Sequence, residues 1–193
     1  MRIALRTAAW LPLLLLSRPV PAGAEWQIRP SVGVYFGQTS TFPAPGSSGG
    51  PSRFGLGITG ALVGNVLGIE ADLGRRTSFF PGSGNGGNVL GSSVTTLTGN
   101  VTVALPKRLV EYTLRPYFVG GAGLMTVRID QFNNLFDISK NLNAIDVGGG
   151  VTGFLTNRIG LNWEVRHFRS IGESQGPPEL SFWRANMALA IRY

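Results

Sequence analysis

Apolar and polar residues alternate with a period of two along most of the chain from Trp26 onward. Successive side chains of a β-strand point to opposite faces, so this alternation predicts strands with one apolar and one polar face. The pattern is clear over residues 67–74, 96–105, 159–166 and 183–193, and weaker over 26–36, 54–62, 112–124 and 144–155. The sequence therefore predicts eight strands, each close to the roughly 9–11 residues that a tilted membrane-spanning strand needs.

The connections between these strands fall into two groups. We expect tight turns at 63–66, 106–111 and 156–158, and longer polar loops at 37–53, 75–93, 126–142 and 169–180. Short turns at one end and long loops at the other are typical of an outer-membrane β-barrel. An even number of strands places both chain ends on the short-turn side, which is the periplasmic side in such a barrel.

The composition of the two faces indicates which one points outward. A soluble barrel is polar outside, whereas a membrane barrel is apolar outside and polar inside. The chain has only two lysines, Lys107 and Lys140, too few for a solvated exterior. The charges on the polar face are nearly balanced, which suits a paired interior network, and they are Arg29, Arg115, Arg166, Arg184, Arg192, Glu70, Asp72, Asp146 and Glu164. Eight strands enclose a space that side chains fill, so we interpret Glu164 and Arg166 as lumen-filling residues, with a selectivity element in a narrow pore as the alternative.

Aromatic residues lie near both ends of the predicted apolar face. Trp26, Tyr112 and Tyr193 fall at the short-turn ends of their strands. The long-loop ends carry Phe36, Phe54 and Trp183. Amphipathic rings prefer the membrane–water boundaries, so these two groups predict two aromatic belts around a lipid-facing barrel.

The first 24 residues have the layout of a secretory signal peptide. A basic start with Arg2 and Arg6 precedes an apolar run over 8–16 and the small-residue site Ala22-Gly23-Ala24. The run is shorter than the roughly 20 apolar residues of a membrane-spanning helix. We predict cleavage after Ala24, which leaves an exported barrel domain of residues 25–193.

Several classes of chemistry are excluded or weakly supported by the sequence. No Cys and a single His rule out disulfide scaffolds, Cys-ligated zinc and multi-His metal sites. Residues 82–87 match the glycine spacing of a dinucleotide-binding loop but lack its strand-to-helix setting, so we interpret them as a surface loop. No basic cluster is interleaved with aromatic residues, which argues against nucleic-acid binding. We predict no catalytic, cofactor-binding or metal-binding residues and no cofactor.

The chain resembles the small outer-membrane β-barrel proteins of the OmpA/OmpX type. The resemblance rests on the signal peptide, the eight alternating strands, the segment 115–123 (RPYFVGGAG) and the terminal aromatic residue. It implies an eight-stranded antiparallel up-and-down transmembrane barrel in the cell outer membrane, without a cofactor. The alternating apolar residues that end at Tyr193 resemble the signal read by the barrel-insertion machinery.

Some eight-stranded outer-membrane barrels are lipid A deacylases, which carry a His and a Ser two residues apart on a lipid-facing strand surface. His167, Ser170 and Glu173 are the candidates here. Ser170 and His167 point to opposite faces of the strand unless a bulge intervenes. A nucleophile needs its base within about 3 Å, which this arrangement does not provide. We therefore interpret His167 as a residue of the interfacial belt, with Arg169 beside it.

The expected function is a monomeric, non-catalytic outer-membrane protein with a structural or surface-interaction role through four long loops. Its expected partners are outer-membrane lipid and lipopolysaccharide, which could contact loop cations, and a possible extracellular partner. The loop-region cations are Arg53, Arg75, Arg76, Arg128, Lys140 and Arg169. The alternatives are a lipid A-modifying enzyme and a soluble periplasmic carrier barrel.

Overall fold

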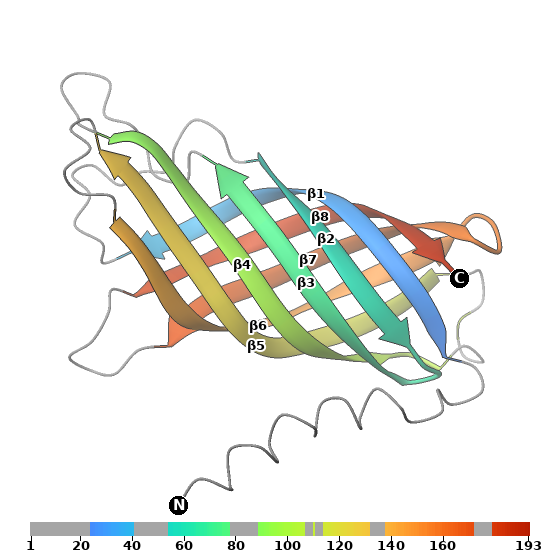
Figure 1. The fold of residues 1–193 in the computed structure, drawn as a ribbon. Helices are drawn as coiled ribbons and strands as arrows, with labels where there is room; N and C mark the ends of the chain where they lie inside the picture. Colours follow the sequence, from blue (N-terminus) through green and yellow to red (C-terminus); the bar gives the residue numbers. More distant parts are fainter. Residues whose placement is uncertain are drawn as a thin grey trace, which may run out of the picture.

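The chain forms a closed antiparallel barrel of eight strands, seen from the side in Figure 1. The computed structural model describes residues 24–40, 54–77, 89–106, 110, 114–131, 138–171 and 179–193. The strands are β1 (Glu25–Ser40), β2 (Phe54–Val63), β3 (Leu67–Thr77), β4 (Val89–Ala104), β5 (Leu114–Gln131), β6 (Ile138–Phe154), β7 (Ile159–Ile171) and β8 (Leu180–Arg192). No helix in these described ranges is long and apolar enough to cross a membrane. The fold class predicted from the sequence is confirmed.

Each strand pairs with its neighbours in the chain, and β8 closes the barrel against β1. In the closing ladder Gln27 lies opposite Arg192, and Phe36 lies opposite Trp183. The N–H of Tyr193 donates to the carbonyl of Trp26 at 3.0 Å, so the last residue continues this ladder. The start of β1 and the end of β8 therefore meet at one end of the barrel, which we call the terminal end. The opposite end, where β1 finishes and β2 begins, is the loop end (Figure 1).

Side-chain exposure alternates along every strand, and the apolar face points outward. Exposed apolar residues on the exterior include one from each strand, namely Val32, Ile58, Ile69, Val101, Phe118, Val147, Trp163 and Met187. Buried interior residues include Arg29, Thr59, Glu70, Asn100, Tyr117, Asp146, Glu164 and Arg184. An apolar exterior around a polar interior is the arrangement of a barrel whose solvent is lipid. A soluble carrier barrel needs the reverse arrangement over these strands.

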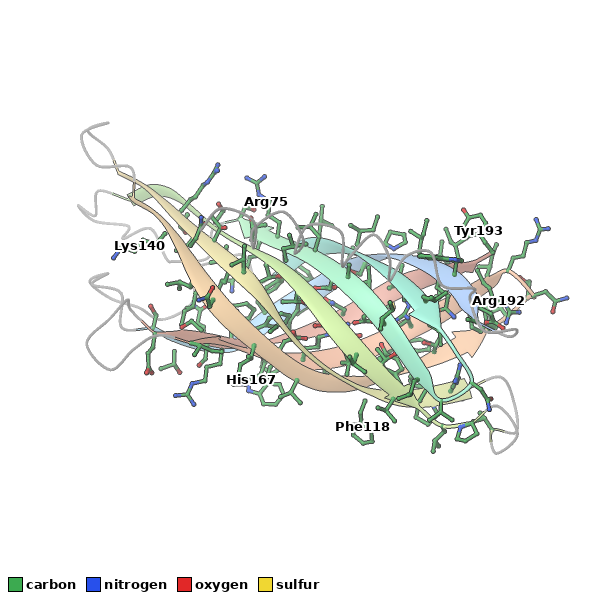
Figure 2. The ribbon with its side chains drawn as sticks, turned by 60° about the horizontal axis from the view of Figure 1, so that its bottom comes forward. Arg75, Phe118, Lys140, His167, Arg192 and Tyr193 are labelled. Atoms are coloured by element: carbon green, nitrogen blue, oxygen red, sulfur yellow. The ribbon has the colours of Figure 1, made fainter. Side chains whose placement is uncertain are left out.

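The exterior aromatic residues lie where the sequence predicts them. Trp26 and Tyr193 lie at the terminal end, and Phe36, Phe54 and Trp183 lie toward the loop end, all exposed. Figure 2 shows Tyr193 at the terminal end and Phe118, a further exposed ring, pointing away from the barrel wall. The sixth predicted residue, Tyr112, lies outside the described residues.

The strands extend further toward the loop end than the sequence analysis predicts. Part of each expected loop, 37–53, 75–93, 126–142 and 169–180, is strand, and the connectors that remain are 41–53, 78–88, 132–137 and 172–179. At the terminal end, the connector between β4 and β5 spans 105–113 and is longer than the expected tight turn at 106–111. The contrast in connector length between the two ends is therefore weaker than expected.

The loop-end extensions were missed because the alternation reverses there. On β5, Leu124 is exterior and apolar, but the next exterior residue is Thr126, and the interior residues on either side of Thr126, Met125 and Val127, are apolar and fully buried. A search for apolar residues on the outward parity loses the strand at this point, although the strand continues. The same reversal occurs on β8, where Phe182 is interior and Ser181 is exterior.

A bulge in β1 near the loop end changes which residues of the strand point into the barrel. The pairing of β1 with β8 shifts register between Phe36 and Thr39, and Gly37 adopts a φ of 59°. This left-handed conformation favours glycine, and such a bulge changes the face to which the following residues point. Gln38 consequently accepts a hydrogen bond from Arg76 Nη1 at 3.0 Å.

The lipid-facing assignment predicts a strong position dependence for charge on β8. Leu189 lies near the middle of the exterior apolar stretch from Trp183 to Tyr193, so Leu189→Arg should cost about 2–4 kcal/mol of unfolding free energy in lipid vesicles. Ser181→Arg, on the same strand and face but beyond the apolar stretch, should cost less than about 1 kcal/mol. Urea titration of the folded protein in vesicles measures both. Equal costs for the two variants would contradict the assignment.

Candidate functional site

Arg166 is the centre of a charged network that fills the middle of the lumen. Its Nε donates to Glu164 Oε1 at 2.5 Å and its Nη2 to Glu164 Oε2 at 2.6 Å, which is a bidentate pair. Its Nη1 reaches Asp146 Oδ2 at 3.3 Å, and its Nη2 also donates to Glu70. Arg166 is completely buried. One guanidinium group from β7 thus joins carboxylates from β3, β6 and β7.

Further ion pairs surround this centre. Arg184 Nη2 donates to Asp72 Oδ2 at 2.6 Å, and Thr59 donates to the other oxygen of Asp72 at 2.9 Å. Arg29 Nη1 lies 3.5 Å from Glu70 Oε2. The buried charged side chains in the described ranges are four arginines, Arg29, Arg76, Arg166 and Arg184, and four carboxylates, Glu70, Asp72, Asp146 and Glu164. Balance of this kind is what burial requires, because an unpaired buried charge is far more costly than a paired one.

The predicted polar-face charges are largely confirmed as lumen residues, with three differences. Arg115 and Arg192 lie at the terminal end, where Arg115 Nη2 donates to the carbonyls of Gly64 and Asn65 at 2.8 and 2.7 Å. Arg192 pairs with Glu25 at 3.2 Å and donates to the carbonyl of Asn157 at 2.7 Å. Arg76, expected in a loop, is an interior residue of β3.

Small residues on the interior parity make room for the long side chains. A Cβ at position 148 would lie 2.8 Å from the Cα and Cγ of Arg166. A Cβ at position 74 would likewise collide with the guanidinium of Arg184. The glycines in these strands therefore provide the volume that the arginines occupy.

Hydrogen bonds carry the network toward the terminal end. Tyr117 donates its hydroxyl proton to Glu164 Oε2 at 2.6 Å. Asn162 Nδ2 donates to the Tyr117 hydroxyl at 2.9 Å and to Thr152 Oγ1 at 2.8 Å. Asn100 Nδ2 donates to Glu70 Oε1 at 3.3 Å. The polar groups of β4, β5, β6 and β7 are thereby linked to the Arg166 centre.

Toward the loop end the lumen becomes apolar, which the sequence analysis did not predict. A cluster of side chains that are at most 2% exposed fills it, comprising Tyr35, Val94, Met125, Val127, Leu142, Ala144, Phe168, Leu180 and Phe182. The rings of Phe168 and Phe182 stack with centroids 5.2 Å apart, and the Arg184 guanidinium lies 4.7 Å from the Phe168 centroid. This apolar cluster separates the charged network from the loop end. In the sequence this cluster is indicated by alternation that continues along the strands with the apolar residues at the inward-pointing positions.

At the terminal end the lumen opens into a cavity of about 400 Å³. Its lining includes Gln27, Arg29, Arg115, Tyr117 and Arg192. The Arg29 guanidinium lies 5.7 Å from the Tyr117 ring centroid at its inner end. The three arginines are each bonded to protein groups, so the cavity is a vestibule whose cations already have partners.

The candidate catalytic residues are not brought together. His167 lies on the exterior of β7, where its ring is 4.8 Å from that of Trp183, and Figure 2 shows it pointing away from the barrel. Ser170 is buried on the interior face, and its Oγ accepts a hydrogen bond from the N–H of Leu180 at 2.8 Å. Glu173 lies outside the described residues. His167 therefore joins Trp183 and Phe36 in a row of rings on the exterior, with Phe36 and Trp183 stacked at 6.5 Å.

The remaining sequence candidates are placed as follows. The described ranges contain no group of three or more His, Asp or Glu side chains that could hold a metal ion. The glycine-rich segment 82–87, Arg53 and residues 1–23 of the expected signal peptide lie outside the described residues. Arg75, Arg128, Lys140 and Arg169 lie on strands near the loop end and are exposed.

Comparison with known proteins identifies the fold. No protein-family model and no curated protein matches the sequence. Among solved structures, Neisserial surface protein A is similar with a TM-score of 0.68 at 14% identity, covering 89% of this chain and 99% of that one. A major outer membrane protein from Thermus thermophilus has a TM-score of 0.57 at 14% identity, covering 89% and 100%. The N-terminal β-barrel domain of Pseudomonas aeruginosa OprF has a TM-score of 0.56 at 12% identity, covering 88% and 97%. The chain thus has the fold of small outer-membrane β-barrels, as the sequence analysis predicts.

The network predicts that Arg166 stabilises the barrel mainly by neutralising its neighbours. Arg166→Met should cost about 3–5 kcal/mol of unfolding free energy, because it leaves three carboxylates buried together. Adding Glu164→Gln to this variant should recover part of the loss. Arg158→Met, at an exposed arginine of the turn before β7, is the matched control and should change little. Urea unfolding in vesicles of these three variants and of Glu164→Gln alone completes the double-mutant cycle, and additive effects of Arg166→Met and Glu164→Gln would contradict the coupling.

Proposed function

We propose that this protein is an integral outer-membrane barrel that serves the cell surface without catalysis, as a structural element and as a scaffold for its loops. The loop end would face outward and the terminal end would face the periplasm. The observation that carries the proposal is the change in the strands near the loop end, where apolar exterior residues give way to polar ones while the sheet continues. In this proposal the strands continue beyond the lipid-facing belt, and the four connections of the chain at the loop end start from these strand ends.

The filled lumen supports this role over transport. Between the vestibule and the loop end lie the ion pairs around Arg166 and then the apolar cluster around Phe168 and Phe182. Eight strands leave only enough interior space for side chains, and here the side chains occupy it. Planar-bilayer recordings of the purified protein should accordingly show no stable conducting state.

The position of His167 and Ser170 supports a non-catalytic role over acyl hydrolysis. The wall of the barrel lies between the imidazole and the hydroxyl, because the two side chains lie on opposite faces of β7. Ser170 Oγ is also engaged by the backbone of β8. A nucleophile and base in this arrangement cannot exchange a proton directly.

A second part of the proposal concerns the exterior of β8, which reaches the terminal end. The exterior of β8 carries Trp183, Met187, Leu189 and the final Tyr193, all exposed and apolar or aromatic. We assign to this strand the contact with the barrel-insertion machinery expected from the sequence. The folded barrel is expected to act as a monomer.

Epitope tags placed at the two ends test the orientation. A short tag inserted into segment 82–87 should be labelled by antibody on intact cells, since this segment joins β3 to β4 at the loop end. The same tag at 156–158, between β6 and β7, should be labelled only after the outer membrane is permeabilised. Heat-dependent mobility on SDS gels serves as the folding control for both. The opposite labelling pattern would overturn the proposed orientation.

A further inference from the structure

The exterior of β3–β6 changes its chemistry near the loop end. The last apolar exterior residues of these strands are Leu73, Leu97, Leu124 and Ile145. The positions that follow on the same face are polar and exposed or half-buried, and we call them the exterior polar face: Arg75, Thr77, Ser93, Thr95, Thr126, Arg128, Asn141 and Asn143. No carboxylate side chain stands on this face among those that the structure describes, Asp130 being outside that set.

The sheet register arranges this face in continuous rows. Arg75 lies opposite Thr95, Thr95 opposite Thr126, and Thr126 opposite Asn141, which gives one row across four strands. Thr126 Oγ1 donates to Asn141 Oδ1 at 2.8 Å within this row. The next row toward the loop end contains Thr77, Ser93 and Arg128. The hydroxyl groups of Ser93 and Thr95 on β4 therefore lie between the two guanidinium groups, and the amides of Asn141 and Asn143 on β6 extend the face beyond Arg128.

The two arginines stand at a defined separation. Arg75 is on β3 and Arg128 is two strands away on β5, one exterior position closer to the loop end. Strand spacing and rise place their Cα atoms about 12 Å apart, from about 10 Å across two strands and about 7 Å along them. Figure 2 shows Arg75 projecting outward from the barrel wall.

We propose that the exterior polar face binds the phosphorylated disaccharide of lipid A. This proposal rests on the proposed function in that the loop end must face outward. Each guanidinium can pair with a phosphate through two hydrogen bonds. A diphosphorylated disaccharide carries one phosphate at each end of its two-sugar unit, which matches two arginines separated by the hydroxyl groups of β4.

The layer below this face matches the remaining part of the same molecule. The exterior of Leu73, Leu97 and Leu124 is apolar and exposed, so acyl chains that descend from the sugars meet apolar side chains. A glycerophospholipid also has acyl chains and a phosphate. Its head group, however, ends near one phosphate and does not span the hydroxyl groups of Ser93 and Thr95 between Arg75 and Arg128.

Binding of fluorescently labelled diphosphoryl lipid A to the folded protein in detergent micelles tests this assignment. Arg75→Gln/Arg128→Gln should weaken binding about tenfold or more, the effect expected when charge-assisted hydrogen bonds are lost. Lys107→Gln/Arg108→Gln removes the same charge from the connector at the terminal end and should change binding less than about twofold. Ser93→Ala/Thr95→Ala should weaken binding while leaving the charge unchanged, because these hydroxyl groups lie between the two arginines.

Two further ligands make the test independent of the variants. Monophosphoryl lipid A and phosphatidylglycerol should each bind the wild-type protein about tenfold more weakly than diphosphoryl lipid A. Equal binding of phosphatidylglycerol, or unchanged binding by folded Arg75→Gln/Arg128→Gln, would overturn the proposal. The surface-tag experiment keeps the two proposals apart, because external labelling of segment 82–87 with no lipid A selectivity refutes this inference alone.

Discussion

Backbone hydrogen bonding in lipid is the constraint on which the rest of this structure depends. A hydrocarbon environment offers no partner to an exposed N–H or C=O group, so a sheet can cross it only as a closed barrel. The pairing of β8 with β1 provides that closure, and the final residue takes part through the bond from Tyr193 to Trp26. The antiparallel order follows, because each strand pairs with the strand that precedes it in the chain.

Closure with eight strands then dictates the interior. The enclosed space has room for side chains and little else, and those side chains have no bulk water to solvate their charges. Arg166, with three carboxylate partners, and Arg184, paired with Asp72, meet this requirement by mutual neutralisation. The volume they need comes from positions such as Gly148 and Gly74, where a larger residue would collide with the arginines. Composition and electrostatics are thus two aspects of one packing problem.

The sequence was sufficient for the parts of the barrel where a single alternation rule holds. It predicted eight strands, the direction of each face, and the interior charges Arg29, Glu70, Asp72, Asp146, Glu164, Arg166 and Arg184. It could not give the partners of these charges, since pairing depends on the barrel register and on side-chain reach. It also failed near the loop end, where Arg76, Phe168 and Phe182 are interior residues of strands that the apolar-outward rule had already ended. Alternation with a period of two indicates a strand. Which of the two faces carries the apolar residues depends on whether lipid or water surrounds that part of the barrel, and this differs between the two ends of a strand.

The apolar residues thus move from the exterior face to the interior face within one continuous sheet. Over the part of the strands nearer the terminal end, the exterior is apolar and the interior is charged, as lipid requires. Nearer the loop end the interior is apolar, with Met125, Val127, Phe168 and Phe182 in its core. The exterior there is polar, with Thr126, Arg128 and Asn141 facing outward, as on a water-soluble protein. The loop end of the barrel has an apolar core that packs without lipid, whereas the apolar exterior nearer the terminal end needs lipid around it. The second core therefore gives the strands a packed interior where the apolar exterior has ended.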